Sequence, residues 1–261
     1  MSKIRPFEIS IPQTALDDLQ HRLANIRFPE ASPAALWDQG IPLDYTQSLA
    51  EYWRDDYNWQ RCEAALKRYN HFITEIDGLD IHFMHIKSPR KDARPLIMTH
   101  GWPGSFIEFM EVIEPLNNPV DDNDPAFHLI IPSLPGYGFS GRPSETGWGI
   151  ERTAAAWDIL MTRLGYDRYF AQGGDWGSLV TSMIGVQNMG HCAGLHINFV
   201  VVGPPSDSIT STLTPQEAAS LARFADYQST GAGYAEIQRT KPQTLGSVSY
   251  THLTLPTICS G

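Results

Sequence analysis

A carboxylate stands at the tightest turn that this sequence predicts. Residues 173–177 read Gly-Gly-Asp-Trp-Gly and lie between a short apolar segment and a segment with helical periodicity. Glycines around Asp175 allow a sharp turn from strand to helix, and the first N–H groups of that helix favour an ionised side chain. A carboxylate is already an anion at neutral pH and suits displacement on saturated carbon, which gives an alkyl ester. The pattern therefore predicts Asp175 as a nucleophile and favours an epoxide or an alkyl halide as the substrate.

Two other interpretations of this turn stay open. Asp is a preferred N-cap residue, so Asp175 could serve only to cap the helix that follows it. Ser178 is a second candidate nucleophile, although it lies past the apex of the turn, inside the predicted helix.

The elements around Asp175 alternate between strand and helix patterns. Short apolar segments predict strands at 95–99, 127–131, 168–172 and 195–202, and helical periodicity lies between them at 105–114, 150–164 and 177–189. This alternation implies right-handed crossovers and a mostly parallel sheet. Before it, the pair Asp77-Gly78 predicts a hairpin between strands at 71–77 and 79–87. The fold class is therefore α/β, with six strands in all.

The same patterns divide the chain into four segments. Residues 1–70 form an aromatic-rich helical meander, with helices near 11–26, 45–57 and 59–70, and residues 71–203 form the α/β core. Residues 204–246 are helical again, with one helix opening at Thr214 and another at 233–240. Residues 247–261 carry no charged side chain and match neither pattern.

Three motifs of this sequence resemble those of the epoxide hydrolases in the α/β-hydrolase superfamily. They are residues 100–105 (His-Gly-Trp-Pro-Gly-Ser), 135–140 (Pro-Gly-Tyr-Gly-Phe-Ser) and 173–178 (Gly-Gly-Asp-Trp-Gly-Ser). Segments 7–29 and 234–246 resemble the N-terminal region and the lid of the microsomal-type branch, which has bacterial and fungal members. The resemblance extends from about residue 5 to residue 246 and implies an α/β-hydrolase fold with a helical lid.

This resemblance implies that epoxides are converted to vicinal diols through a covalent ester on Asp175. It also implies that Tyr234 is one of two lid tyrosines that bind the epoxide oxygen. A phenol suits that role because it can donate a hydrogen bond, and then a proton, as the ring opens. Tyr227 and Tyr137 are competing candidates for it. The implied partners are a small apolar epoxide and water, and no cofactor or metal is expected.

Residues 99–105 correspond to the loop that supplies one oxyanion-hole donor in α/β-hydrolases. The backbone N–H groups of Trp102 and Trp176 are the predicted donors, and they would stabilise the tetrahedral intermediate when water hydrolyses the ester. We expect His100 in this loop to be structural. The Trp102–Pro103 peptide bond is a candidate for the cis form.

Two alternative functions stay open. A haloalkane dehalogenase also places Trp after its Asp nucleophile, and indole N–H groups hold the departing halide. The N-terminal segment and the context of Tyr234 favour epoxides instead. A pseudoenzyme that only binds a ligand is the alternative outside catalysis.

The catalytic acid, the histidine and the second lid tyrosine follow the end of the resemblance in this family. Only His191, His196 and His252 follow Asp175. We expect His191 to be structural, His196 to lie in a core strand, and His252 to lie in a tail foreign to the fold. With six strands counted where the fold has eight, we expect the last two to be missing. The expected chain is thus a C-terminally truncated, weakly stable fragment that forms the ester without turnover.

Composition excludes several other classes of function. The 261-residue chain has a formal net charge of −10 and no dense Lys/Arg stripe, which argues against nucleic acid and anionic membrane as partners. Its apolar runs are shorter than the roughly 18 residues of a membrane span. The three cysteines are far apart, so neither a disulfide framework nor a Cys-x-x-Cys metal site is expected. These features favour a soluble, cytoplasmic protein of undetermined oligomeric state.

Overall fold

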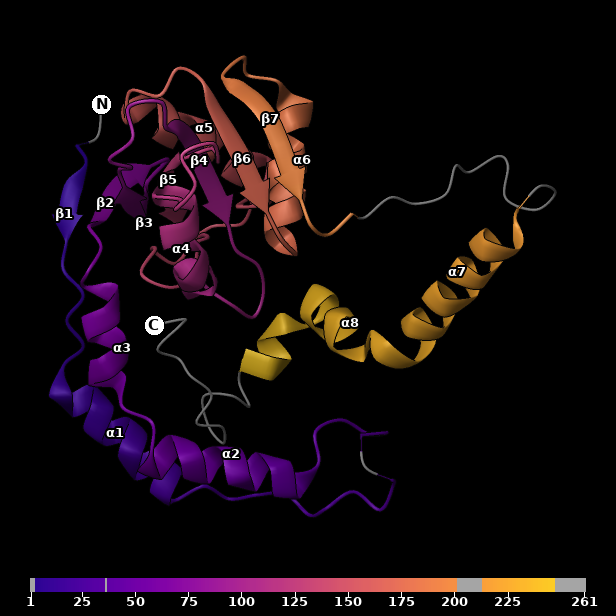
Figure 1. The fold of residues 1–261 in the computed structure, drawn as a ribbon. Coiled ribbons are helices and arrows are strands. Elements are labelled where there is room, and N and C mark those ends of the chain that lie inside the picture. Colours follow the sequence, from indigo (N-terminus) through magenta and orange to yellow (C-terminus); the bar gives the residue numbers. More distant parts are fainter. Residues whose placement is uncertain (1–2, 36, 201–212, 247–261) are drawn as a thin grey trace. The chain divides into compact units, whose positions relative to one another are not determined.

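The computed structural model describes residues 3–35, 37–200 and 213–246. Contacts divide the chain into two compact units (Figure 1). Of the described chain, the sheet unit contains residues 3–10 and 58–200, and the helical unit contains residues 11–35, 37–57 and 213–246. Asp175, Trp102 and Trp176 therefore belong to the sheet unit, whereas Tyr234 belongs to the helical unit.

Within the described residues, seven strands form one mixed sheet in the order β1-β2-β3-β5-β4-β6-β7 (Figure 1). Their bounds are Arg5–Phe7 (β1), His71–Ile76 (β2), Leu79–Ile86 (β3), Arg94–Thr99 (β4), Phe127–Pro132 (β5), Tyr169–Gly173 (β6) and Cys192–Ile197 (β7). The pairs β1–β2, β2–β3 and β3–β5 are antiparallel, whereas β5, β4, β6 and β7 run parallel to one another. The predicted α/β class and the parallel arrangement of the core strands are confirmed.

Helices cover this sheet and fix the strands that lead to the site. They are the 3₁₀ helix η1 (Phe106–Phe109), α4 (Met110–Asn117), α5 (Ile150–Arg163) and α6 (Trp176–Gln187), while α3 (Trp59–Leu66) belongs to the same unit and precedes β2. Helices α5 and α6 pack against each other, and α6 packs on β4, β6 and β7. Trp157 and Leu160 of α5 are fully buried in one core cluster with Ile97 of β4 and Ala171 of β6. Apolar burial thus holds β4 and β6, whose ends carry the predicted site residues, in a fixed register.

The helical unit is built from short helices with few buried side chains. They are α1 (Gln13–Ala24), α2 (Leu43–Asp55), α7 (Pro215–Asp226), the π-helical turn η2 (Tyr227–Gly231) and α8 (Gly233–Thr240). Helix α7 opens with a capping box, in which Thr214 Oγ1 accepts from the Glu217 N–H and the Glu217 carboxylate accepts from the Thr214 N–H. Neither α2 nor α8 has a buried residue.

Three details differ from the sequence-based expectation. Strand β1 was missed, because a three-residue strand that contains Pro6 has no room for an alternating pattern, so the predicted count of six strands is wrong. The helix predicted over 105–114 is split into η1 and α4, and α4 continues through Pro115. Strand β7 begins at Cys192 and ends at Ile197, earlier than the predicted 195–202.

The hairpin prediction is confirmed in detail. Asp77 and Gly78 connect β2 to β3 with φ angles of 50° and 80°, the left-handed pair that a two-residue turn requires. None of the helices in the described parts of the chain combines the length and the apolar composition needed to cross a bilayer.

Replacing Trp157 by Ala should strongly destabilise the sheet unit. The side chain is fully buried, and its indole N–H donates a 3.0 Å hydrogen bond to Thr99 Oγ1, so truncation leaves a cavity and an orphaned hydroxyl. We expect the free energy of unfolding, measured by urea denaturation, to fall by about 3–5 kcal/mol. Trp37→Ala is the matched control, because Trp37 is 57% exposed; its effect should stay below about 0.5 kcal/mol. Equal losses in the two variants would contradict this core assignment.

Candidate active site

Asp175 occupies a strained turn between β6 and α6. Its φ and ψ angles are 49° and −124°, a combination that L residues rarely adopt. Two flanking glycines make the turn possible. A Cβ on Gly173 would overlap the carbonyl oxygen of Gly177, and a Cβ on Gly177 would overlap that of Thr99. Strand β6, helix α6 and the end of β4 therefore approach each other more closely than any side chain would permit.

The Asp175 side chain does not cap the helix that it precedes. Although Asp175 is the N-cap residue of α6, its carboxylate accepts no hydrogen bond from that helix. Instead, Oδ1 accepts a 2.7 Å hydrogen bond from the backbone N–H of Trp102. The geometry argues against the capping interpretation and leaves the carboxylate directed toward the 100–105 loop.

Ser178 is poorly placed to be the nucleophile. Its side chain is 1% exposed. Its hydroxyl donates a 2.7 Å hydrogen bond to the carbonyl oxygen of Gly173 and accepts one from the Phe199 N–H. The hydroxyl therefore stabilises the turn from inside the core.

The 100–105 loop lies directly against Asp175. A Cβ on Gly101 would overlap the Asp175 side chain, and the next residue, Trp102, provides the N–H that binds Oδ1. The Trp102–Pro103 peptide bond is cis, as the sequence suggested. Trp176 is the first residue of α6, where backbone N–H groups have no intrahelical acceptor. Both predicted donors thus stand at the ends of elements that meet at Asp175.

His100 is a buried connector within this loop. The Leu134 N–H donates to Nε2, so the proton of the neutral ring is on Nδ1 and is donated to the carbonyl oxygen of Gly101. Burial lowers the pKa of His100 to about 4, and this effect outweighs the opposing hydrogen bond to Gly101. With both ring nitrogens engaged, His100 joins the loop after β4 to the segment after β5, which is a structural role.

A buried chain of hydrogen bonds anchors that neighbouring segment. His71 Nε2 lies 3.0 Å from the Leu66 carbonyl oxygen, which can only accept, so the proton of His71 is on Nε2. His71 Nδ1 then accepts from His82 Nε2, and His82 Nδ1 accepts from the hydroxyl of Ser133. Burial lowers the pKa of both histidines. These neutral rings tie α3, β2 and β3 to the residue that precedes Leu134.

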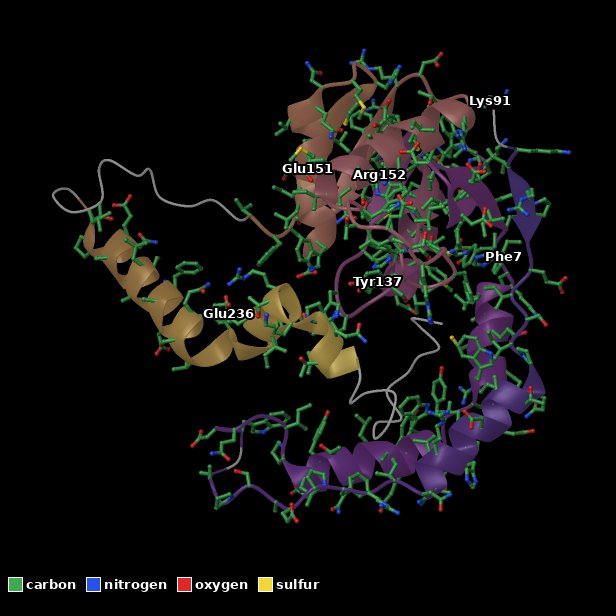
Figure 2. The ribbon with its side chains drawn as sticks, turned by 180° about the vertical axis from the view of Figure 1, so that it is seen from behind. Phe7, Lys91, Tyr137, Glu151, Arg152 and Glu236 are labelled. Atoms are coloured by element: carbon green, nitrogen blue, oxygen red, sulfur yellow. The ribbon has the colours of Figure 1, made fainter. Side chains whose placement is uncertain are left out.

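Two further titratable side chains lie within electrostatic reach of Asp175. Tyr137 is labelled in Figure 2, and its pKa is raised by burial and, secondly, by the negative charge of Asp175. The pKa of Glu108 is raised by the same two causes in the same order. Tyr137 was among the predicted candidates, but Glu108 was missed. The signal that could have identified Glu108 is Ser105-Phe-Ile-Glu108, a capping-box pattern directly after the loop.

An apolar cavity of about 280 Å³ lies beside Trp176. Its wall combines aromatic side chains from three segments, Tyr137, Trp148 and Trp176, with the aliphatic side chains of Ile150 and Val180. Because the charge of Asp175 also acts on Tyr137, this cavity is close to the turn at Asp175. It suits an apolar group rather than a charged one.

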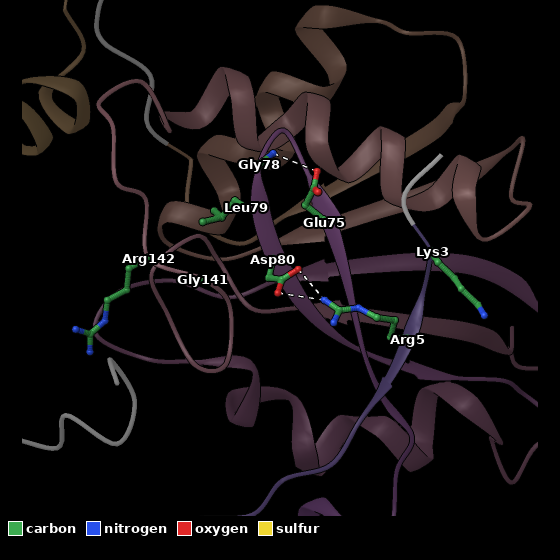
Figure 3. Close-up of a pocket in the computed structure, with 8 residues that line it drawn as sticks. All are labelled: Lys3, Arg5, Glu75, Gly78, Leu79, Asp80, Gly141 and Arg142. Atoms are coloured by element: carbon green, nitrogen blue, oxygen red, sulfur yellow. Dashed lines mark hydrogen bonds and ion pairs between the residues drawn. The ribbon is translucent and has the colours of Figure 1, made fainter.

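A second cavity, of about 650 Å³, is charged and unrelated to Asp175 (Figure 3). Arg5 donates to both carboxylate oxygens of Asp80, at 3.0 and 3.2 Å, and Glu75 accepts from the Gly78 N–H. These contacts tie β1 and the β2–β3 hairpin together. In the described chain, no group of three or more His, Cys, Asp or Glu side chains is arranged to hold a metal ion.

Tyr234 and Tyr227 form a pair within the helical unit. Their hydroxyl oxygens are 3.1 Å apart, with Tyr227 at the start of η2 and Tyr234 in the first turn of α8. Each side chain is roughly half exposed. The two competing lid candidates are therefore mutual hydrogen-bond partners, whereas Tyr137 lies in the sheet unit with Asp175.

The histidines that follow Asp175 lie away from the predicted chemistry. His191 Nδ1 is 3.0 Å from Oδ2 of Asp158, and Oδ1 of the same carboxylate accepts from the Tyr169 hydroxyl. His191 is therefore structural, as expected. We expected His196 to lie in a core strand, and this prediction is wrong. Its side chain is exposed, because β7 is the last strand of the described sheet. His252 lies outside the described residues. Among those residues, no histidine is hydrogen-bonded to Asp175.

Two family models match this chain. The model described as "Epoxide hydrolase N terminus" matches residues 4–109, and the model described as "alpha/beta hydrolase fold" matches residues 94–235, which is more than half of the chain. The chain belongs to the α/β-hydrolase fold family. The resemblance to epoxide hydrolases that the three motifs indicated is confirmed by the N-terminal model and by the relatives.

This α/β-hydrolase chain has relatives that are named as epoxide hydrolases. It is 46% identical over 246 residues to a Stigmatella aurantiaca protein whose name assigns it provisionally to the epoxide hydrolases, covering 93% of this chain and 56% of that protein. The structure of Aspergillus niger epoxide hydrolase matches with a TM-score of 0.84 and 34% identity, over 96% of this chain and 66% of that one. Juvenile hormone epoxide hydrolase from the silkworm Bombyx mori matches with the same TM-score and identity, over 94% and 62%. The chain spans little more than half the length of the curated relatives it matches.

Gly177→Ala should disrupt the turn at Asp175. The new methyl group would overlap the backbone of Thr99, which cannot move without displacing β4. We expect a loss of about 2–3 kcal/mol in the free energy of unfolding, measured by urea denaturation. Gly185→Ala in the same helix is the control, because its methyl group would meet only Leu195 Cδ1, at 2.6 Å, at the tip of a flexible side chain. If the two variants were equally stable, the close approach at Gly177 would be contradicted.

His100 should make the stability of the sheet unit depend on pH. Its folded-state pKa of about 4 lies below the ordinary value of 6.5, so the neutral ring is the form that the fold favours. This contribution is complete above pH 6.5 and is lost as the pH falls toward 4; its size is on the order of 3 kcal/mol. NMR titration of the His100 ring, alongside unfolding experiments at several pH values, measures both quantities. A ring that titrates near pH 6.5 in the folded protein would contradict the assignment.

Proposed function

We propose that this chain acts on epoxides, and that Asp175 attacks them to form a covalent alkyl ester on the way to a vicinal diol. The observation that carries the proposal is the Asp175 carboxylate on its positive-φ turn, with Oδ1 bound to the Trp102 N–H. A serine in this place would need a base to become nucleophilic, whereas a carboxylate needs none. The epoxide hydrolases among the relatives support an epoxide as the electrophile.

In the first step, Asp175 Oδ2 attacks a ring carbon of the epoxide. A carbon–oxygen bond forms, the ring carbon–oxygen bond breaks, and its electron pair moves to the ring oxygen. That oxygen then takes a proton from a phenol, and we assign this role to Tyr234. The hydroxyl of Tyr227, 3.1 Å away, supports the assignment because a hydrogen-bonded neighbour stabilises the phenolate that remains.

In the second step, water attacks the ester carbonyl carbon. The backbone N–H groups of Trp102 and Trp176 stabilise the oxyanion, and collapse of the intermediate releases the diol and restores the Asp175 carboxylate. A base must accept the proton of the water, and the proton then returns to the phenolate. His100 does not serve as this base, because both of its ring nitrogens are engaged by the backbone.

The substrate is assigned to the epoxides with an apolar substituent. The cavity beside Trp176 supports this assignment, because aromatic and aliphatic side chains dominate its wall. Such a wall favours burial of an aryl or alkyl group over burial of a charged group.

Styrene oxide should label this chain once, at Asp175. We expect intact-mass spectrometry to show a single adduct whose mass is that of one epoxide. Asp175→Asn should abolish the adduct while keeping an oxygen that can accept from the Trp102 N–H. Asp167→Asn, which removes an exposed carboxylate elsewhere in the sheet unit, should leave labelling unchanged.

The same experiment distinguishes the alternatives. An adduct that persists in Asp175→Asn would contradict the nucleophile assignment. Stabilisation of the chain by the epoxide without any adduct would indicate a protein that only binds. Diol formed beyond one equivalent per chain would contradict only the expectation that the ester accumulates.

A further inference from the structure

Glu108 is a second carboxyl group beside the nucleophile turn. The side chain as a whole is solvent-exposed, but its carboxyl group is folded back onto the chain. A Cβ on Gly104 would overlap Glu108 Oε1, so this oxygen lies directly over the backbone of the 100–105 loop. The charge of Asp175 acts on the same carboxyl group. Glu108 therefore contacts the loop and also interacts electrostatically with Asp175.

Hydrogen bonds fasten Glu108 to the end of that loop. Its own N–H donates a 3.0 Å hydrogen bond to the Ser105 carbonyl oxygen, and the Ser105 N–H favours the ionised form of its carboxylate, lowering its pKa. The hydroxyl of Ser105 accepts from the Ile107 N–H at 3.4 Å. Together these contacts cap the start of η1 and hold Ser105 in place.

The fixed loop is the one that reaches Asp175. Gly101 packs against the Asp175 side chain, and Trp102 donates to Oδ1. Only two residues separate Trp102 from Ser105. A displacement of the Ser105 end would therefore move the Trp102 N–H away from the carboxylate.

We propose that Glu108 is a positioning residue for Asp175: it holds the loop so that the Trp102 N–H meets the carboxylate, and its negative charge favours conversion of Asp175 into a neutral ester. The proposal rests on the proposed role of Asp175 as a nucleophile. Two neighbouring anions repel each other, and the attack removes one of these charges from Asp175. Ionised Glu108 therefore accelerates the attack.

The pH dependence of labelling gives this role a signature. Burial and the charge of Asp175 raise the pKa of Glu108 above its ordinary 4.5, so Glu108 ionises in a range where most carboxyl groups are already charged. The rate of ester formation should rise across this range. Once Asp175 is an ester, its contribution is gone and the pKa of Glu108 falls, so the two events favour each other.

The test is the rate of styrene oxide labelling at Asp175 between pH 4.5 and 8, followed by mass spectrometry. Glu108→Gln keeps an oxygen for the Ser105 N–H but removes the charge; it should be about threefold slower at neutral pH and should lack the rise. Glu108→Ala loses both functions and should be about tenfold slower or more at every pH. Glu111→Gln removes an exposed charge in the first turn of α4 and should match the unchanged chain.

The rate of amide hydrogen exchange at Trp102 measures how firmly the 100–105 loop is held, and it requires no epoxide. Exchange should accelerate in Glu108→Ala and stay slow in Glu108→Gln. A Glu108→Gln profile that matches the unchanged chain in rate and shape would overturn the role of the charge. Unchanged labelling and Trp102 exchange in Glu108→Ala would overturn the positioning role, even if the variant melts earlier. If the unchanged chain is not labelled at Asp175, the proposed function fails, and the exchange experiment still decides whether Glu108 holds the loop.

Discussion

One hydrogen bond joins the two turns on which the site is built. The Trp102 N–H meets Asp175 Oδ1 at 2.7 Å, a length typical of a bond to an ionised acceptor. It couples the loop after β4 to the turn after β6, two segments more than seventy residues apart in the sequence. Gly101 and Gly177 permit this approach, because a side chain at either of them would collide with the opposite segment. The carboxylate is therefore held in place before any substrate arrives.

The core beneath these turns keeps their geometry from relaxing. Trp157 fills the space under β4 and donates to Thr99, the last residue of that strand. His100 then links the loop to Leu134, and the chain through His82 holds Ser133 beside it. Buried polar groups of this kind are costly unless they are satisfied, so they specify one arrangement of the loops. The strained backbone conformation of Asp175 persists because contacts from several surrounding elements hold it in place.

Sequence patterns predicted the features that depend on interactions between residues close together in the chain. Glycine spacing marked the turn at Asp175, alternation of strands and helices marked the parallel core, and Asp77-Gly78 marked the hairpin. Long-range contacts were out of reach: β1 is too short to carry a pattern, and the edge position of β7 exposed His196. Glu108 was missed because its proximity to Asp175 depends on how the loop folds back, although its capping-box spacing was visible. The π-helical turn η2 brings the hydroxyl groups of Tyr227 and Tyr234 together. The periodicity of the sequence did not predict this turn.

The proposed chemistry requires that Asp175 is the reacting group and that Trp102 holds it. A crystal structure of this chain after reaction with styrene oxide tests both parts together. We expect continuous density from an Asp175 carboxylate oxygen to a substrate carbon, with the Trp102 N–H still within hydrogen-bonding distance of the other oxygen. Density joined to a different side chain, or an Asp175 carboxylate turned away from Trp102, would contradict it.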